Sequence, residues 1–189
     1  MNETDKIKNL VLAPYILKAT ALIGKQRGVG GNQFRHAFAT LAILMDYKLF
    51  ENYILLKASL IHDLLEDVPE TNVAELRQID DQANQVVDLV LEVTRSKGVS
   101  KAAYLKNILE KGSVNARILK VADRISNLTD LHRDQYSWKK MNEYLDQTEK
   151  YVLPMARGVN ANMAIELGDL IEKRRKQMNH LTLPHFLGI

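Results

Sequence analysis

The sequence contains no cysteine. That absence excludes disulfide bonds, thiolate metal sites and a cysteine nucleophile. Glycine and proline are sparse, with 9 and 4 residues in a chain of 189, while 46% of the residues are hydrophobic and 26% are charged. This composition is typical of a soluble globular protein that buries a substantial core, and it argues against the disordered and membrane classes.

The chain also lacks a strong charge of one sign and a long apolar run. Its formal charge of +3 is compatible with a small anionic substrate and is too small to indicate a nucleic-acid-binding protein. The apolar stretch "LVLAPYILKATALIG" is interrupted by Pro14 and Lys18 well short of ~18 uncharged residues. We therefore expect a core-packing helix there, no membrane segment and no signal peptide, which makes the cytoplasm the default location.

Apolar residues recur at helical spacing along nearly the whole chain, and no alternating strand pattern of useful length appears. The sequence predicts an all-α fold, a single compact multi-helix bundle. The only glycine-rich segment, "GKQRGVGGNQF", is predicted to be a loop. The predicted helices cover residues 5–24, 36–48, 52–66, 73–79, 82–95, 101–111, 115–131, 138–156 and 160–178.

Local signals set several of the predicted helix ends. Pro69 ends the helix over 52–66, because the residue before a proline disfavours the helical conformation. Ser100 is a suitable cap for the helix over 101–111, and Gly112 fits a left-handed position past its end. The basic stretch that begins the tail "EKRRKQMNHLTLPHF" is interpreted as a solvated helix face, so no nucleic-acid partner is expected.

The stretch "SLIHDLLEDVPET", residues 59–71, carries ionisable side chains inside an apolar run. Such groups are costly in a core unless water or a cation satisfies them. On a continuous helix, His62 and Glu66 share a face, and so do Asp63 and Asp67. Imidazole plus carboxylate suits a divalent first-row metal such as manganese, iron or zinc, but two ligands are too few for a site.

Two further residues are candidates to complete such a site. His36 follows the glycine-rich loop and opens the apolar helix "HAFATLAILM". Asp123 lies in "ILKVADRISNL", where it shares a face with Asn127 away from the apolar side. Each residue alone is more typical of an ordinary role, a packing or capping histidine and a surface ion pair. Together with the His62–Asp63 doublet, they indicate a metal site built from separate helices.

Four stretches make the sequence similar to a known family: "QRGVGGNQFRHA", "ASLIHDLLEDV", "LVLEVTRSK" and "ILKVADRISNL". In this order and spacing they resemble the HD-domain phosphohydrolases, and among them the RelA/SpoT-type alarmone hydrolases. The resemblance is strongest over residues 19–157. It implies a single HD hydrolase domain over 1–189, with residues 160–189 as a C-terminal helix and tail.

The resemblance also implies an activity and a set of site residues. The activity is manganese-dependent hydrolysis of the 3′-pyrophosphate of guanosine 3′,5′-bis(diphosphate) or its pentaphosphate, which yields pyrophosphate and GDP or GTP. Another divalent first-row metal stays open, and so does a homo-oligomer. The implied metal ligands are His36, His62, Asp63 and Asp123. The implied catalytic residues, which position or activate the attacking water, are Glu66 and Asp67. The implied substrate-binding residues are Arg27, Asn127, Lys97 and Tyr144.

The chain departs from the family pattern mainly on the substrate side. Gly28 stands where a second basic residue is common, Ala37 replaces a usual proline, and Val68 replaces a frequent threonine. "NQFR" replaces an aromatic-aliphatic lead-in to His36. These departures keep one alternative open, an HD phosphohydrolase that acts on a nucleoside mono- or triphosphate or a cyclic nucleotide. A third hypothesis is a non-catalytic helical module that binds nucleotides or a partner protein. Its expected signature is the loss of a metal ligand or of the acidic pair, and here all six positions are filled.

Overall fold

A computed structural model describes residues 3–131 and 137–182, and in these ranges it is built from helices with no β-strand, which confirms the all-α prediction. A single isolated bridge pairs Gln26 with Asn32. The helices are α1 (Glu3–Ile7), α2 (Ala13–Ala19), η1 (Thr20–Leu22), α3 (Gln33–Asp46), α4 (Tyr53–Ile61), α5 (Leu64–Asp67), α6 (Val73–Leu76), α7 (Ala83–Val93), α8 (Lys101–Lys111), α9 (Val114–Asp130), α10 (Trp138–Gln147), the π-helical segment η3 (Thr148–Val152), α11 (Leu153–Val159) and α12 (Ala161–Thr182).

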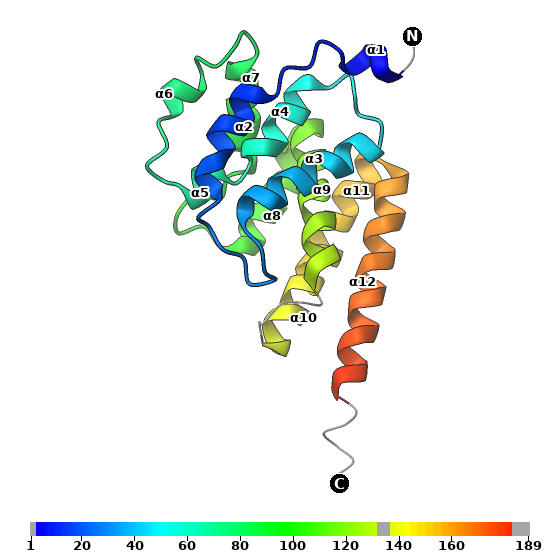
Figure 1. Cartoon of the computed structure of the whole chain (residues 1–189). Helices are drawn as coiled ribbons and strands as arrows, with labels where there is room; N and C mark the ends of the chain where they lie inside the picture. The colour runs from blue at the N-terminus through cyan, green and yellow to red at the C-terminus, as the bar shows by residue number, and fades with distance from the viewer. Residues whose placement is uncertain (1–2, 132–136, 183–189) are drawn as a thin grey trace.

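Helices α4 and α9 form the centre of the bundle. Every residue of α4 from Leu55 to Ile61 is buried, as expected for a helix that is apolar nearly all round. Helix α3 packs against both α4 and α9, and α7 covers α4 from another side (Figure 1). Each fully buried leucine in this core contributes about 1.5–3 kcal/mol, so the central helices are fixed firmly in place.

The long helix α12 braces the C-terminal half of the molecule and runs beside α9 and α11 (Figure 1). The buried Arg174 donates from Nε to the carbonyl oxygen of Leu128 and from Nη2 to that of Thr129, each at 2.6 Å. These two carbonyls belong to the last turn of α9, where the carbonyl oxygen of Leu128 also accepts from the N–H of Leu131. Arg174 therefore fixes the end of α9 that lies nearest to α10.

Two predicted helices are interrupted. The predicted helix over 5–24 is α1, α2 and η1, because Pro14 begins a new helix in the first turn of α2 instead of lying within a longer one. The predicted helix over 52–66 breaks at His62 and Asp63, which form a turn between α4 and α5. Apolar residues recur at helical spacing on both sides of each break, so the sequence pattern did not reveal the two breaks. None of the described helices combines the length and the apolarity needed to cross a membrane.

Gly112 does not adopt the predicted conformation at the end of α8, whereas the glycine-rich segment is a loop, as predicted. Gly112 has φ −63°, so the expected left-handed position is wrong. A Cβ at that residue would lie 2.5 Å from the carbonyl oxygen of Ile108, so close approach explains the glycine. Gly30 and Gly31, with φ of 83° and 73°, turn the loop before α3 through the left-handed region. The predicted tail beyond residue 182 lies outside the described residues.

Candidate metal centre and substrate cavity

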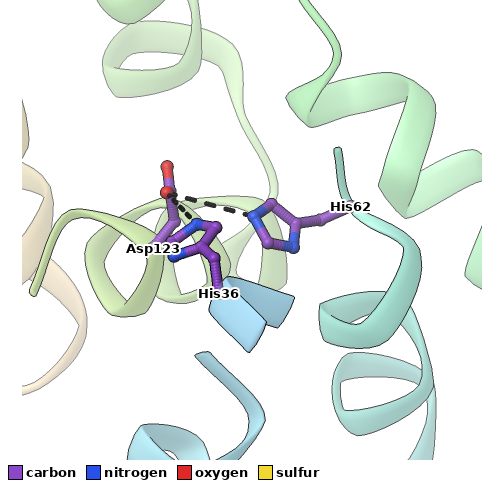
Figure 2. A group of neighbouring side chains, drawn as sticks. All are labelled: His36, His62 and Asp123. Carbon is purple, nitrogen blue, oxygen red and sulfur yellow. Dashed lines mark hydrogen bonds and ion pairs between the residues drawn. The ribbon is translucent and has the colours of Figure 1, made fainter. Parts of the chain in front are cut away.

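Two imidazoles and two carboxylates from three separate segments converge at the centre of the bundle. His36 Nε2 lies 3.0 Å from Asp123 Oδ1 and 3.7 Å from Asp63 Oδ2. His62 Nε2 lies 3.2 Å from Asp63 Oδ2 and 3.9 Å from Asp123 Oδ1. Figure 2 shows the rings of His36 and His62 directed toward the Asp123 carboxylate. The structure thus brings together the four residues that the sequence proposed as ligands.

The turn between α4 and α5 sets the direction of the doublet. His62 Nδ1 donates to the carbonyl oxygen of Ser59 at 2.7 Å, so its Nε2 points into the cluster. The backbone oxygen of Asp63 accepts from the N–H groups of Glu66 and Asp67, which starts α5 at this point. The doublet therefore lies on a turn and not on one continuous helical face, although Glu66 and Asp67 still reach the same cavity.

Neighbouring side chains hold His36 and Asp123 in place. His36 Nδ1 lies 2.9 Å from Ser126 Oγ, and with Nδ1–H donating to that oxygen, Nε2 presents a lone pair to the cluster. Asp123 Oδ2 accepts from Lys120 Nζ at 2.7 Å, and its Oδ1 accepts from Asn127 Nδ2 at 2.6 Å. Lys120, Asp123, Ser126 and Asn127 recur at helical spacing on α9, so one helix supplies a ligand candidate and its supports.

Burial and nearby opposite charges have opposing effects on the pKa values of the residues in the cluster. Burial disfavours the charged His62 ring, but the carboxylates of Asp63 and Asp123 outweigh it and raise the pKa of His62 to about 9. Burial likewise opposes ionisation of Asp63, yet the neighbouring His62 lowers the pKa of Asp63 to about 2. Despite burial, the ammonium group of Lys120 and the imidazole of His36 hold the pKa of Asp123 well below its usual range. The cluster is built to keep its carboxylates negative.

The donor set fits a divalent cation. His36, His62 and Asp123 each offer a ligand atom, and these atoms lie within 4.8 Å of one another. His62 Nε2 is buried and makes no hydrogen bond among the described residues, although Asp63 Oδ2 lies 3.2 Å away. A buried nitrogen without a hydrogen bond costs free energy, and a cation between it and the carboxylates would satisfy it. Two imidazoles with carboxylates suit a first-row divalent metal, so this group could hold a metal ion.

A cavity of about 630 Å³ opens above the cluster and is lined by His36, Asp63 and Asp123 on one side. The acidic pair lies at the same end. Glu66 accepts from the backbone N–H of Arg95 at 3.3 Å and lies 3.5 Å from its guanidinium group. Asp67 accepts from Gln33 Nε2 at 2.8 Å. Burial and the charge of Asp63 raise the pKa of Asp67, against the effect of the Gln33 hydrogen bond.

Arg27 and Asn127 lie side by side on the cavity wall. Arg27 Nη2 donates to Asn127 Oδ1 at 2.8 Å, and its Nη1 lies 3.5 Å from Asp130 Oδ2. The Arg27 side chain is 8% exposed. Because Asn127 also contacts Asp123, this pair connects the metal end of the cavity to the glycine-rich loop.

Tyr144 lines the other end of the cavity, whereas Lys97 is exposed and is not among the lining residues. The same region contributes a different cation to the cavity, Lys101, whose Nζ lies 4.6 Å from the centre of the Tyr144 ring. The buried Arg124 stacks over that ring at 4.0 Å. Burial and the charge of Arg124 lower the pKa of Lys101 to about 8. A cavity end with these cations around one aromatic ring is suited to an anionic group.

Sequence reasoning missed several residues that surround the site, namely Gln33, Lys101, Lys120, Arg124 and Ser126. The helical spacing of Lys120 and Ser126 from Asp123 was a usable signal, since residues three apart lie on one face. No comparable signal marked Gln33 or Lys101. Their positions depend on how the loops before α3 and α8 approach the cavity.

No protein-family model matches the chain. Curated relatives do match. The guanosine-3′,5′-bis(diphosphate) 3′-pyrophosphohydrolase MESH1 of Drosophila melanogaster is 30% identical over 125 residues, which cover 63% of this chain and 68% of the relative. The proteins of the same name from Mus musculus and Homo sapiens are 29% and 28% identical over 152 residues, and each match covers 77% of this chain and 82% of the relative.

A solved structure supports the fold. The structure of a metazoan orthologue of SpoT that hydrolyses ppGpp aligns with a TM-score of 0.76 at 23% identity, covering 86% of this chain and 94% of that chain. The alignment shows that the chain has the same fold. The curated relatives define the class as an HD-type hydrolase, as the sequence predicted. The same relatives identify the family within this class. The chain belongs to the family of MESH1 guanosine-3′,5′-bis(diphosphate) 3′-pyrophosphohydrolases.

Proposed function

We propose that this protein hydrolyses the 3′-pyrophosphate of guanosine 3′,5′-bis(diphosphate) or its pentaphosphate to pyrophosphate and GDP or GTP. Membership of the MESH1 family supports the activity, because the curated relatives carry the name of this reaction. The observation that carries the proposal is the convergence of His36, His62, Asp63 and Asp123 at one end of a cavity that also holds basic side chains. We further propose that residues 1–189 form one hydrolase domain.

The metal is proposed to be manganese, with another divalent first-row metal as the alternative. We assign His36, His62, Asp63 and Asp123 as its ligands. When bound, such a cation supplies positive charge for a phosphoryl oxygen and lowers the pKa of a coordinated water. The supports of these ligands then have clear roles, since Ser126 and Ser59 orient the two rings and Lys120 orients the Asp123 carboxylate.

The acidic pair handles the attacking water. The water oxygen forms a bond to the phosphorus attached to O3′, the bond from that phosphorus to O3′ breaks, and O3′ takes up a proton from solvent water. The proton of the water passes to a carboxylate, which we assign to Asp67, because Arg95 already engages Glu66. Glu66 is proposed to orient Arg95 and the adjacent phosphate group. Both carboxylates belong to α5, which the turn at Asp63 directs toward the cavity.

The cations of the cavity match a substrate with two diphosphate groups. Arg27 presents a guanidinium group beside Asn127 near the metal end, where it is placed to hold the 3′-pyrophosphate. Lys101 and Arg124 lie at the Tyr144 end, where they are placed to hold a second anionic group. In this proposal Lys101 takes the substrate-binding role that the family resemblance implied for Lys97.

A panel of nucleotides assayed with manganese tests the proposal, with phosphate and pyrophosphate release measured separately. We expect pyrophosphate, without free phosphate, from guanosine 3′,5′-bis(diphosphate). The Asp63→Asn variant is the matched control, and it should lose both metal and turnover. Activity on deoxynucleotides or cyclic nucleotides with none on the bis-diphosphate would favour another HD phosphohydrolase. Absence of bound metal, with unchanged behaviour of Asp63→Asn, would favour a non-catalytic module.

A further inference from the structure

Gln33 is the one residue of the "NQFR" segment that reaches the acidic pair. It is the first residue of α3, and its side chain lines the cavity together with that of His36, three residues further on. Residues three apart lie on the same face of a helix, so α3 presents the Gln33 amide beside the imidazole of a proposed metal ligand. The mechanism described above leaves this amide without a role.

The glycine-rich loop fixes the position of Gln33. Its backbone N–H donates to the carbonyl oxygen of Lys25 at 2.9 Å, which closes the loop. Asn32 caps α3 by accepting from the N–H of Arg35 at 3.0 Å. The positive φ of Gly31 allows the tight approach to this cap. The backbone of Gln33 is therefore held on both sides, and its side chain extends from a rigid base.

The two ends of the Gln33 amide are used unequally. Nε2 donates to Asp67 Oδ2 at 2.8 Å. Oε1 is buried and has no hydrogen-bond partner among the described residues. Oε1 has almost no accessible surface, so Gln33 acts on the cavity through Nε2 and the Asp67 carboxylate that Nε2 holds.

We propose that Gln33 is a positioning residue for the attacking water: Nε2 holds the Asp67 carboxylate in the orientation in which that carboxylate accepts the proton of the water. Gln33 takes up no proton itself, since the proton that leaves the water passes to Asp67. This inference rests on the proposed hydrolase activity.

Two variants separate this role from simple packing. Gln33→Met keeps the length of the side chain and removes the hydrogen bond to Asp67. Gln33→Glu keeps the shape, but it places a second carboxylate against Asp67, where like charges repel. If Gln33 only filled space, the Gln33→Met variant, whose side chain has a similar length, would keep its turnover. If Gln33 positions Asp67 and the water, both variants should lose turnover.

The experiment measures kcat and KM of both variants on the nucleotide that the wild-type protein hydrolyses fastest. We expect kcat to fall by about 10- to 100-fold, because misplaced groups cost roughly that much, while KM and metal content stay near the wild-type values. Gln85→Met, on the exposed face of α7, is the matched control and should retain wild-type kcat. Wild-type kcat in Gln33→Met and Gln33→Glu, or a loss confined to KM, would overturn the proposal.

A structural readout makes the test independent of the substrate. In a crystal structure of the wild-type protein with manganese and pyrophosphate, Gln33 Nε2 should donate to Asp67, and a water should lie within hydrogen-bond distance of the Asp67 carboxylate. In crystals of Gln33→Met the Asp67 carboxylate should turn away and this water should be lost. A wild-type structure in which Gln33 points away from Asp67 would refute the inference. Lack of hydrolysis by the wild-type protein would instead refute the proposed function.

Discussion

The ion pair between Lys120 and Asp123 gives a quantitative prediction for the metal-free protein. Asp123 is 6% exposed and Lys120 is 9% exposed, and their charged atoms lie 2.7 Å apart. In Asp123→Asn the shape is kept but the negative charge is lost, so the Lys120 ammonium group is left buried with a weaker partner. Removing one partner of a buried pair costs about 3–5 kcal/mol. For a chain of this length we expect Tm to fall by roughly 6–12 °C for a 3 kcal/mol loss.

The double variant separates the lost charge from lost packing. In Asp123→Asn with Lys120→Met no buried charge remains unpaired, so about 2 kcal/mol of the lost stability should return. The assay is urea unfolding followed by circular dichroism, with a chelator present so that all proteins are compared without metal. Neither variant should bind metal, because both lack the Asp123 carboxylate. The reasoning is refuted if Asp123→Asn unfolds at the wild-type urea concentration, or if adding Lys120→Met gives no recovery.

Two further predictions concern catalysis. Glu66→Gln should retain bound metal, because Glu66 lies outside the proposed ligand set. It should lose most turnover, by about 10²-fold, because Glu66 is proposed to orient Arg95 and the adjacent phosphate group. Loss of metal in this variant would contradict the separation of metal ligands from the acidic pair. Lys101, whose pKa is lowered to about 8, carries its charge below that pH and loses it above, so kcat/KM should decline as the pH rises through about 8. Lys101→Arg, which stays charged, should remove this alkaline decline, and an unchanged pH profile would argue against Lys101 as a substrate contact.

The proposed metal ligands could be selected from the sequence because each is an ionisable residue in or beside an apolar segment. The His62–Asp63 doublet interrupts an apolar run, and Asp123 interrupts the helix that became α9. Ionisable groups in such segments require satisfaction, and a shared cation is one way to obtain it. The resemblance to known hydrolases then linked segments that periodicity alone could not bring together.

The sequence did not predict the features that depend on where a helix breaks or on the path of a loop. The turn at His62 was missed because its neighbours on both sides are apolar and helical. Lys97 and Lys101 are both basic residues near the start of α8, and only the path of the loop decides which one reaches the cavity. The contact between Gln33 and Asp67 joins residues 34 positions apart, at the start of α3 and at the end of α5, and no local pattern encodes it.

Anomalous X-ray scattering at the manganese edge, on crystals grown with manganese, would locate the metal in the protein. We expect one strong peak bounded by His36 Nε2, His62 Nε2 and the carboxylates of Asp63 and Asp123, each roughly 2 Å from the ion. A peak elsewhere in the molecule, or a cluster that binds no metal at saturating manganese, would contradict this expectation.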